Sequence, residues 1–379
     1  MEIKNLKKAS LRIAKAVKNK EKIIIFGDSD LDGVSSVIIL KESIKNLDYK
    51  DVTIYFSDRE KHGYGINKHI VKQVKGPGLF ISLDCGIANF EEVKALKKNK
   101  FDVIIIDHHE ILDQGLPKAD IIVDPKQKGD RYPFKQFANV GLVYKLARVL
   151  LKDKLTDNLK KDFLELAAIA TIADMMPQTD DNEEIIIEGL SSLRQSWRPG
   201  IQALLSLDSI KGLSITQQVN KMNALLNIRD IEHQYPASFR LLTISSDEEA
   251  GNMVEVLMEK QIEKRKKIKD IIRQVESRIS KDNIIFEGSS DWELILLGIV
   301  ASILVQKYQR PVFLYAKNDK ESQGSIRAPS GFNVVEAMKG FSKNLITYGG
   351  HPKAAGFRIK NKYLDKFKQS LIDYFDSLN

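Results

Sequence analysis

The sequence predicts an α/β protein in which a domain with a parallel sheet is joined by a long helix to a smaller α/β domain. Short apolar runs rich in Ile and Val alternate with helical patterns over the first 125 residues. Residues 246–281 carry the longest helical pattern, and the mixture of strand and helix patterns returns after it. A chain of 379 residues is also long for one core, so two domains are expected.

Five apolar runs in the first part of the chain are expected to be strands. Each is short and almost continuously apolar, as is typical of strands that helices cover on both faces. They read KIIIFGDSD, VTIYFSD, LFISLDCG, FDVIIIDHH and ADIIVDP. Helices are expected between them, for example over 34–46 and 89–99. This alternation predicts a doubly wound parallel sheet.

The remainder of the chain reads as helices and then as a second α/β pattern. Apolar residues recur at helical spacing over 139–226. Further on, DWELILLGIVASILVQKY and RPVFLYA predict a strand, a helix and a strand, and the glycine-rich stretches GSIRAPSGF and YGGHPKAAGF predict turns. We therefore expect a first domain over 1–235, a linker helix over 236–282 and a second domain over 283–379.

Composition restricts the class of protein. Cys85 is the only cysteine, so no disulfide can form within the chain, which fits the reducing cytoplasm. No apolar stretch approaches the roughly 20 residues of a membrane span, and the basic N-terminus lacks the apolar core of a signal peptide. The net charge of +8 agrees with a polyanionic partner such as nucleic acid, although many lysine-rich chains have none.

Acidic and imidazole side chains follow several of the expected strands. The first strand is followed by three aspartates at every second position, and crowded carboxylates repel one another unless a cation lies among them. Because ligands bind at the carboxyl ends of parallel strands, the groups that follow the strands are expected to meet at one edge, and a later helical stretch supplies one more acidic group. The residues are Asp28, Asp30, Asp32, Asp84, Asp107, His108, His109 and Asp174.

Each of these residues alone has an ordinary structural interpretation. A single Asp after a strand usually caps a helix or a turn, and a His pair is more often structural than a ligand. Their combination instead favours divalent cations, and mixed carboxylate and imidazole ligands suit Mn²⁺, Mg²⁺ or Zn²⁺. Two such ions about 3.5–4 Å apart are a known clamp for phosphate ester hydrolysis. Cys85 is better interpreted as a small buried residue than as a ligand.

The motifs resemble those of a known family. DSDLDG, SLDCG, DHHE and TIADMMP resemble, in order and spacing, the metal motifs of the DHH phosphoesterases, and GGHPKAAGF resembles the signature of the accompanying DHHA1 domain. Within that superfamily, REKHGYGIN, ANVGLVYKLA, ELAAIATIADMMPQTDDN, LLGIVASIL and GSIRAPSGFNVVEA resemble the RecJ exonucleases. The resemblance covers nearly the whole chain.

The resemblance implies a role for each motif residue. One metal would be held by Asp28, Asp30 and Asp84, and the other by Asp32, Asp84, His108 and Asp174, so that Asp84 bridges them. His109 would face the scissile phosphate and Asp107 would orient a histidine, which makes Asp84, Asp107 and His109 the expected catalytic residues. Arg59 would contact a phosphate of the substrate. The 5′-terminal end would be held by Arg327, Gly349, Gly350 and His351.

The implied function is a two-metal exonuclease that degrades single-stranded DNA from its 5′ end, in repair or recombination. The expected cofactors are two divalent cations, with Mn²⁺ preferred and Mg²⁺ also suitable. The expected partner is single-stranded nucleic acid, DNA in the first place, together with a single-strand-binding protein or a helicase. No membrane partner is expected, and the expected location is the cytoplasm.

Two other functions remain open. RecJ proteins usually carry an OB-fold, which this sequence does not show after the DHHA1-like part, and Leu226–Asn227 and Ile303 stand where cations are common in the family. These departures would favour a hydrolase of short oligonucleotides or phosphorylated nucleotides, like the nanoRNases of the same superfamily. The third possibility is a non-catalytic scaffold, against which the complete set of ligand positions argues.

Overall fold

The computed structural model describes residues 2–377, and the chain divides into two compact units, 1–261 and 262–379. The predicted α/β class is confirmed. The boundary lies within α12 (Asp247–Glu276), the long helix that the sequence predicts. A separate helix, α11 (Ala237–Thr243), precedes α12 because the backbone is extended at Ile244, so the segment 236–282 holds two helices where one was expected. The three-part domain division remains a prediction.

The first unit is built on a five-stranded parallel sheet in the order β2-β1-β3-β4-β5. Four of the five strands fall within the predicted apolar runs, and β3 begins one residue before its run, at Gly78. The five strands are β1 (Ile23–Gly27), β2 (Val52–Phe56), β3 (Gly78–Leu83), β4 (Phe101–Ile106) and β5 (Ile121–Val123). The central strands β1, β3 and β4 therefore end side by side, and the residues that follow them are brought to one edge of the sheet.

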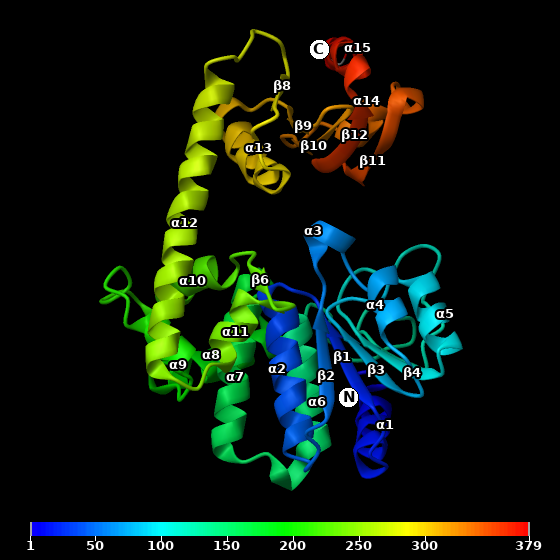
Figure 1. The fold of residues 1–379 in the computed structure, drawn as a ribbon, viewed down its shortest axis with the longest axis vertical. Helices are drawn as coiled ribbons and strands as arrows, with labels where there is room; N and C mark the ends of the chain where they lie inside the picture. The colour runs from blue at the N-terminus through cyan, green and yellow to red at the C-terminus, as the bar shows by residue number, and fades with distance from the viewer. Residues whose placement is uncertain (1, 378–379) are drawn as a thin grey trace. The chain divides into compact units, whose positions relative to one another are not determined.

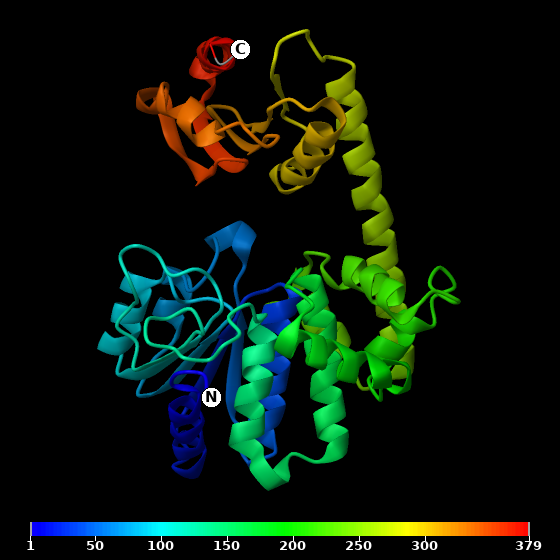
Figure 2. The ribbon, with the colours of Figure 1, turned by 180° about the vertical axis from the view of Figure 1, so that it is seen from behind.

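Helices cover both faces of this sheet. Ile23 and Ile25 of β1 belong to one core with α1 (Leu6–Lys18), α2 (Leu31–Lys45) and α6 (Asn139–Leu151). Ile24 and Phe26 point into a second core with α4 (Lys68–Gln73) and α5 (Phe90–Lys98). In Figures 1 and 2, α4 and α5 lie on the opposite side of the strands from α2 and α6. Burial on both faces explains the continuous apolar runs.

The helices predicted over 139–226 are present and extend the first core. After α6 they are α7 (Asp157–Ala173), α8 (Asp180–Ser192), α9 (Pro199–Leu205) and α10 (Ile215–Leu226). A buried ion pair joins α7 to the residue before α9, since the guanidinium of Arg198 donates to both carboxylate oxygens of Asp162 at 2.6 Å. No helix among the described residues is long and apolar enough to cross a membrane.

The second unit contains another five-stranded sheet, in the order β11-β12-β10-β9-β8. Only β8 and β9 are parallel, and the other neighbours are antiparallel. Its strands are β8 (Ile285–Ser289), β9 (Val312–Lys317), β10 (Glu321–Arg327), β11 (Leu345–His351) and β12 (Ala354–Lys360). Its helices after α12 are α13 (Leu294–Tyr308), α14 (Val334–Lys339) and α15 (Leu364–Asp376).

Two predictions in this unit are wrong in detail. The stretch DWELILLG contains no strand, because Leu296 and Leu297 already pack as buried residues of α13 and the strand lies upstream in β8. Most of the two glycine-rich stretches is strand, and turns are confined to 330–331 and 352–353. Glycine serves close packing here, since a Cβ at Gly324 would lie 2.4 Å from the Phe357 ring across the β10–β12 ladder.

Candidate metal centre

The edge of the parallel sheet is held by backbone hydrogen bonds that continue the strand ladder. The amide of Asp28 donates to Leu83 at 3.2 Å, and the amide of Asp84 donates to Ile106 at 3.0 Å. Asp84 has a φ of 59°, in the left-handed region that residues other than Gly, Asn and Asp seldom adopt. The residues that follow β1, β3 and β4 therefore place acidic side chains at the same edge of the sheet.

One group of possible ligand atoms comes from Asp28, Asp30 and Asp84. One oxygen from each carboxylate lies within 4.8 Å of the other two. Asp28 and Asp84 are buried, whereas Asp30 is partly exposed and caps α2 by accepting from the Gly33 amide at 3.2 Å. The family resemblance implied this trio, and the structure brings its members together.

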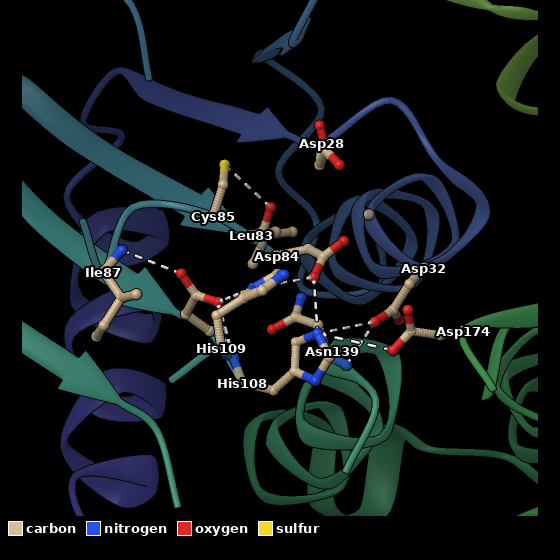
Figure 3. A network of polar contacts seen from close by, with 12 residues as sticks. Asp28, Asp32, Leu83, Asp84, Cys85, Ile87, His108, His109, Asn139 and Asp174 are labelled. Atoms are coloured by element: carbon tan, nitrogen blue, oxygen red, sulfur yellow. Dashed lines mark hydrogen bonds and ion pairs between the residues drawn. The ribbon is translucent and has the colours of Figure 1, made fainter. Parts of the chain in front are cut away.

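A second group comes from Asp32, His108 and Asp174, which lie on α2, after β4 and at the end of α7. The Nε2 atom of His108 lies 3.8 Å from Asp32, 3.7 Å from Asp174 and 3.2 Å from Oδ1 of Asp84. Figure 3 shows Asp84 between this group and Asp28. The geometry thus places Asp84 where a carboxylate would serve both groups.

The protonation of His108 suits a metal ligand. Its Nδ1 lies 2.8 Å from the backbone oxygen of Phe137, and a carbonyl can only accept, so Nδ1 carries the proton. Burial, aided by the neighbouring His109, lowers the pKa of His108 to about 4. The ring is therefore neutral at pH 7, with the lone pair of Nε2 directed at the carboxylates.

Burial and mutual repulsion raise the pKa values of three carboxylates in these groups. Burial raises the pKa of Asp84 well above its usual range, and the charge of Asp32 adds to this effect. Burial and the charge of Asp174 likewise raise the pKa of Asp32, although its oxygens accept from the amides of Asn139 and Val140 at 2.7 Å. Burial and the charge of Asp30 raise the pKa of Asp174 to about 6.

These groups fit divalent cations. The buried Oδ1 of Asp84 has no hydrogen-bond partner in the described part of the chain, and the other members supply oxygen and imidazole nitrogen. Such a donor set suits Mn²⁺ and Mg²⁺. A cation bound there would remove the repulsion that raises these pKa values.

His109 is held by Asp107 beside the two groups. The buried carboxylate of Asp107 accepts from Nδ1 of His109 at 2.8 Å and from the amide of Ile87 at 3.0 Å. Burial acts to lower the pKa of His109, but the bond to Asp107 outweighs it and the pKa is raised. The hydroxyl of Tyr64 contacts the His109 ring at 3.2 Å and donates to the Asp84 carbonyl at 2.8 Å. His109 can therefore act as a cationic donor to a bound anion.

Arg59 lies within the first group. Its Nε donates to Asp28 at 3.0 Å and its Nη2 donates to Asp30 at 2.7 Å. Its guanidinium also lies 5.0 Å from the centre of the Tyr64 ring. The sequence predicted a phosphate contact for Arg59 and gave no indication that it pairs with two of the expected ligands.

Cys85 takes no part in either group. Its side chain is fully buried, lies 3.3 Å from the Ser82 hydroxyl and donates weakly to the Leu83 carbonyl at 3.5 Å. Burial raises the pKa of this thiol, which disfavours the thiolate that a metal would need. This agrees with its interpretation as a small buried residue.

The predicted end-binding residues come together in the second unit. Arg327 pairs with Ala354 of β12, which pairs in turn with His351 of β11. β11 is an edge strand, so one row of its backbone groups, including those around Gly349 and Gly350, has no strand partner among residues 2–377. Exposed backbone amides and a guanidinium are suitable groups for a phosphate.

Sequence reasoning assigned no role to three further residues near these sites. Tyr64 lies in the stretch REKHGYGIN, and its nearness to Arg59 in the sequence was the feature that could have indicated a role at the site. Asp124 follows β5 and adds another buried carboxylate at the same sheet edge. Gly298 of α13 leaves room for Arg327, because a Cβ there would lie 3.1 Å from its Nη2 atom.

Comparison with known proteins agrees with this architecture. Residues 22–171 match the model of the DHH family, N-terminal domain, and residues 281–377 match the DHHA1 domain. The fold and these two matches thus define a protein that carries a DHH domain followed by a DHHA1 domain.

The chain is similar to RecJ proteins. It is 34% identical to the single-stranded-DNA-specific exonuclease RecJ of Bacillus subtilis, over 99% of this chain and 48% of that protein. It is 27% identical to the RecJ of Haemophilus influenzae, over 96% of this chain and 68% of that protein. A crystal structure of exonuclease RecJ bound to manganese superposes with a TM-score of 0.85 at 25% identity, covering 99% of this chain and 95% of that one. The chain thus spans about half the length of the Bacillus relative.

Proposed function

We propose that the protein is a divalent-cation-dependent phosphodiesterase that removes nucleotides from the 5′ end of single-stranded DNA. The observation that carries the proposal is the meeting of two ligand groups at Asp84, one with Asp28 and Asp30 and the other with His108. The similarity to RecJ exonucleases supports the choice of substrate. Repair or recombination in the cytoplasm, with a single-strand-binding protein or a helicase, is the proposed setting.

The site residues have complementary tasks in this reaction. Bound divalent cations would supply Lewis acidity and an activated water to the phosphate. Asp84 and the two groups around it would hold the ions, and Asp107 would keep His109 oriented and cationic. His109 would then donate a hydrogen bond to the phosphate as negative charge develops on it. Arg327 and the edge of β11 would bind the terminal nucleotide.

The test is cleavage of a long single strand labelled at either end, in DNA and in RNA, with Mn²⁺ or Mg²⁺. We expect mononucleotides from the 5′ end of DNA and no cleavage in EDTA. A 3′-directed product series, or cleavage without a divalent cation, would refute the proposal.

The second candidate function is hydrolysis of very short oligonucleotides. It is favoured by Ile303, an exposed aliphatic side chain on α13 where the RecJ resemblance leads us to expect a cation. Comparing turnover of a dinucleotide with that of the long strand separates the two functions. Cleavage of the dinucleotide alone would select this second function.

A further inference from the structure

The guanidinium of Arg59 pairs with two of the three carboxylates of the first group. Arg59 donates to Oδ1 of Asp28 and to Oδ2 of Asp30, and its Nη2 also pairs with the second oxygen of Asp28. Asp28 is completely buried, and the Arg59 side chain is 28% exposed. Arg59 therefore acts as a counter-ion to carboxylates that would otherwise be buried without one.

The second group has no such internal cation. Within residues 2–377, the only ion-pair partner of Asp32 and of Asp174 is the imidazole of His108, and neither carboxylate pairs with a Lys or an Arg. The two groups thus differ in one respect that concerns metal binding. A cation enters the second group without competition, whereas in the first group it meets a guanidinium already bonded to two of the three carboxylates.

We propose that Arg59 is an internal competitor for the first metal position, and that entry of the metal releases its guanidinium toward the substrate phosphate. A metal ion bound by Asp28 and Asp30 would repel the guanidinium that lies against the same two carboxylates, so binding of one disfavours binding of the other. The released side chain remains beside Tyr64, whose ring it already contacts. The release step rests on the proposed function, because it supplies the phosphate-binding cation only once the metal is in place.

Titration calorimetry with Mn²⁺ and without DNA tests the competition. The wild type is expected to bind one ion tightly and one weakly, and Arg59→Gln to strengthen only the weak event, roughly tenfold. Lys61→Gln is the matched control, since Lys61 lies in the same short helix, α3 (Arg59–His62), and pairs only with Asp58 among the described residues. It removes the same charge and is expected to leave both affinities unchanged.

A weak affinity in Arg59→Gln within twofold of the wild type, or an equal strengthening in Lys61→Gln, would overturn the inference. Because no DNA is present, this failure differs from failure of the strand-cleavage assay, which tests the proposed function.

Discussion

The imidazole ring of His108 lies between the backbone oxygen of Phe137 and the carboxylate of Asp84 and contacts both. Its Nδ1 donates to Phe137 at 2.8 Å, and its Nε2 lies 3.2 Å from Oδ1 of Asp84. The first contact fixes the tautomer, and the second directs the free lone pair to the place where both ligand groups meet. This relationship between a strand end and the loop before α6 orients His108 as a metal ligand would need to be oriented.

Replacing His108 by Asn is therefore expected to weaken Mn²⁺ binding at the second group by more than about 100-fold, because a ligand is lost and not only its support. Calorimetry on the purified variant measures this. His69→Asn is the control, since His69 lies outside both groups and contacts Gln73. If both Mn²⁺ affinities of His108→Asn equalled those of the wild type, His108 would not be a metal ligand.

Tyr64→Phe is expected to lower the rate of strand cleavage by about 2- to 10-fold. The change removes the hydroxyl that donates to the Asp84 carbonyl and contacts His109, and such a hydrogen bond contributes about 0.5–1.5 kcal/mol. The ring that Arg59 contacts is kept. Steady-state kinetics on a labelled strand measure the rate, and Mn²⁺ affinity should not change. A rate equal to that of the wild type would show that the hydroxyl has no part in orienting His109.

Arg327→Gln is expected to raise the KM for strands with a 5′-phosphate by about 10-fold and to leave the KM for 5′-hydroxyl strands nearly unchanged. A hydrogen bond between charged groups contributes about 1.5–3 kcal/mol, and only the phosphorylated end offers it. Arg358→Gln is the control in the same sheet, since Arg358 pairs with Glu321. Equal changes in the KM for strands with a 5′-phosphate and for strands with a 5′-hydroxyl would show that Arg327 does not bind the terminal phosphate.

Asp124 makes the stability of the fold depend on pH. Its Oδ1 accepts from the Lys126 amide at 2.7 Å, its Oδ2 has no hydrogen-bond partner among the described residues, and burial raises its pKa to about 7. An acid whose pKa is higher in the folded state binds its proton more tightly there, so its contribution to stability is lost as pH rises from about 4 to about 7.

As the pH is raised from 5 to 8, the free energy of unfolding of Asp124→Asn is expected to increase relative to that of the wild type by about 2–3 kcal/mol. Urea unfolding in EDTA at both pH values measures the difference, and the other titrating groups are common to both proteins. A constant difference between the two proteins would show that Asp124 has the same pKa in the folded and unfolded states.

The sequence predicted the parallel sheet and the meeting of acidic and imidazole side chains at its edge for a simple reason. Strands with continuous apolar runs must be covered on both faces, and strand ends such as those before Asp28 and Asp84 then share an edge. It could not predict the pairing of Arg59, because that residue follows an outer strand and its side-chain direction depends on the loop that carries it. The glycines of β10 to β12 were mistaken for turns because their packing partners, such as Phe357 against Gly324, lie on another strand.

The most direct test of the two-metal account is Mn²⁺-dependent cleavage of a 5′-labelled single strand by Asp84→Ala, with circular dichroism as the check on folding. Asp84 contributes an oxygen to the group of Asp28 and Asp30 and lies 3.2 Å from His108 of the other group. The account predicts a folded protein with no detectable Mn²⁺-dependent cleavage. A folded Asp84→Ala variant that cleaves at the wild-type rate would contradict it.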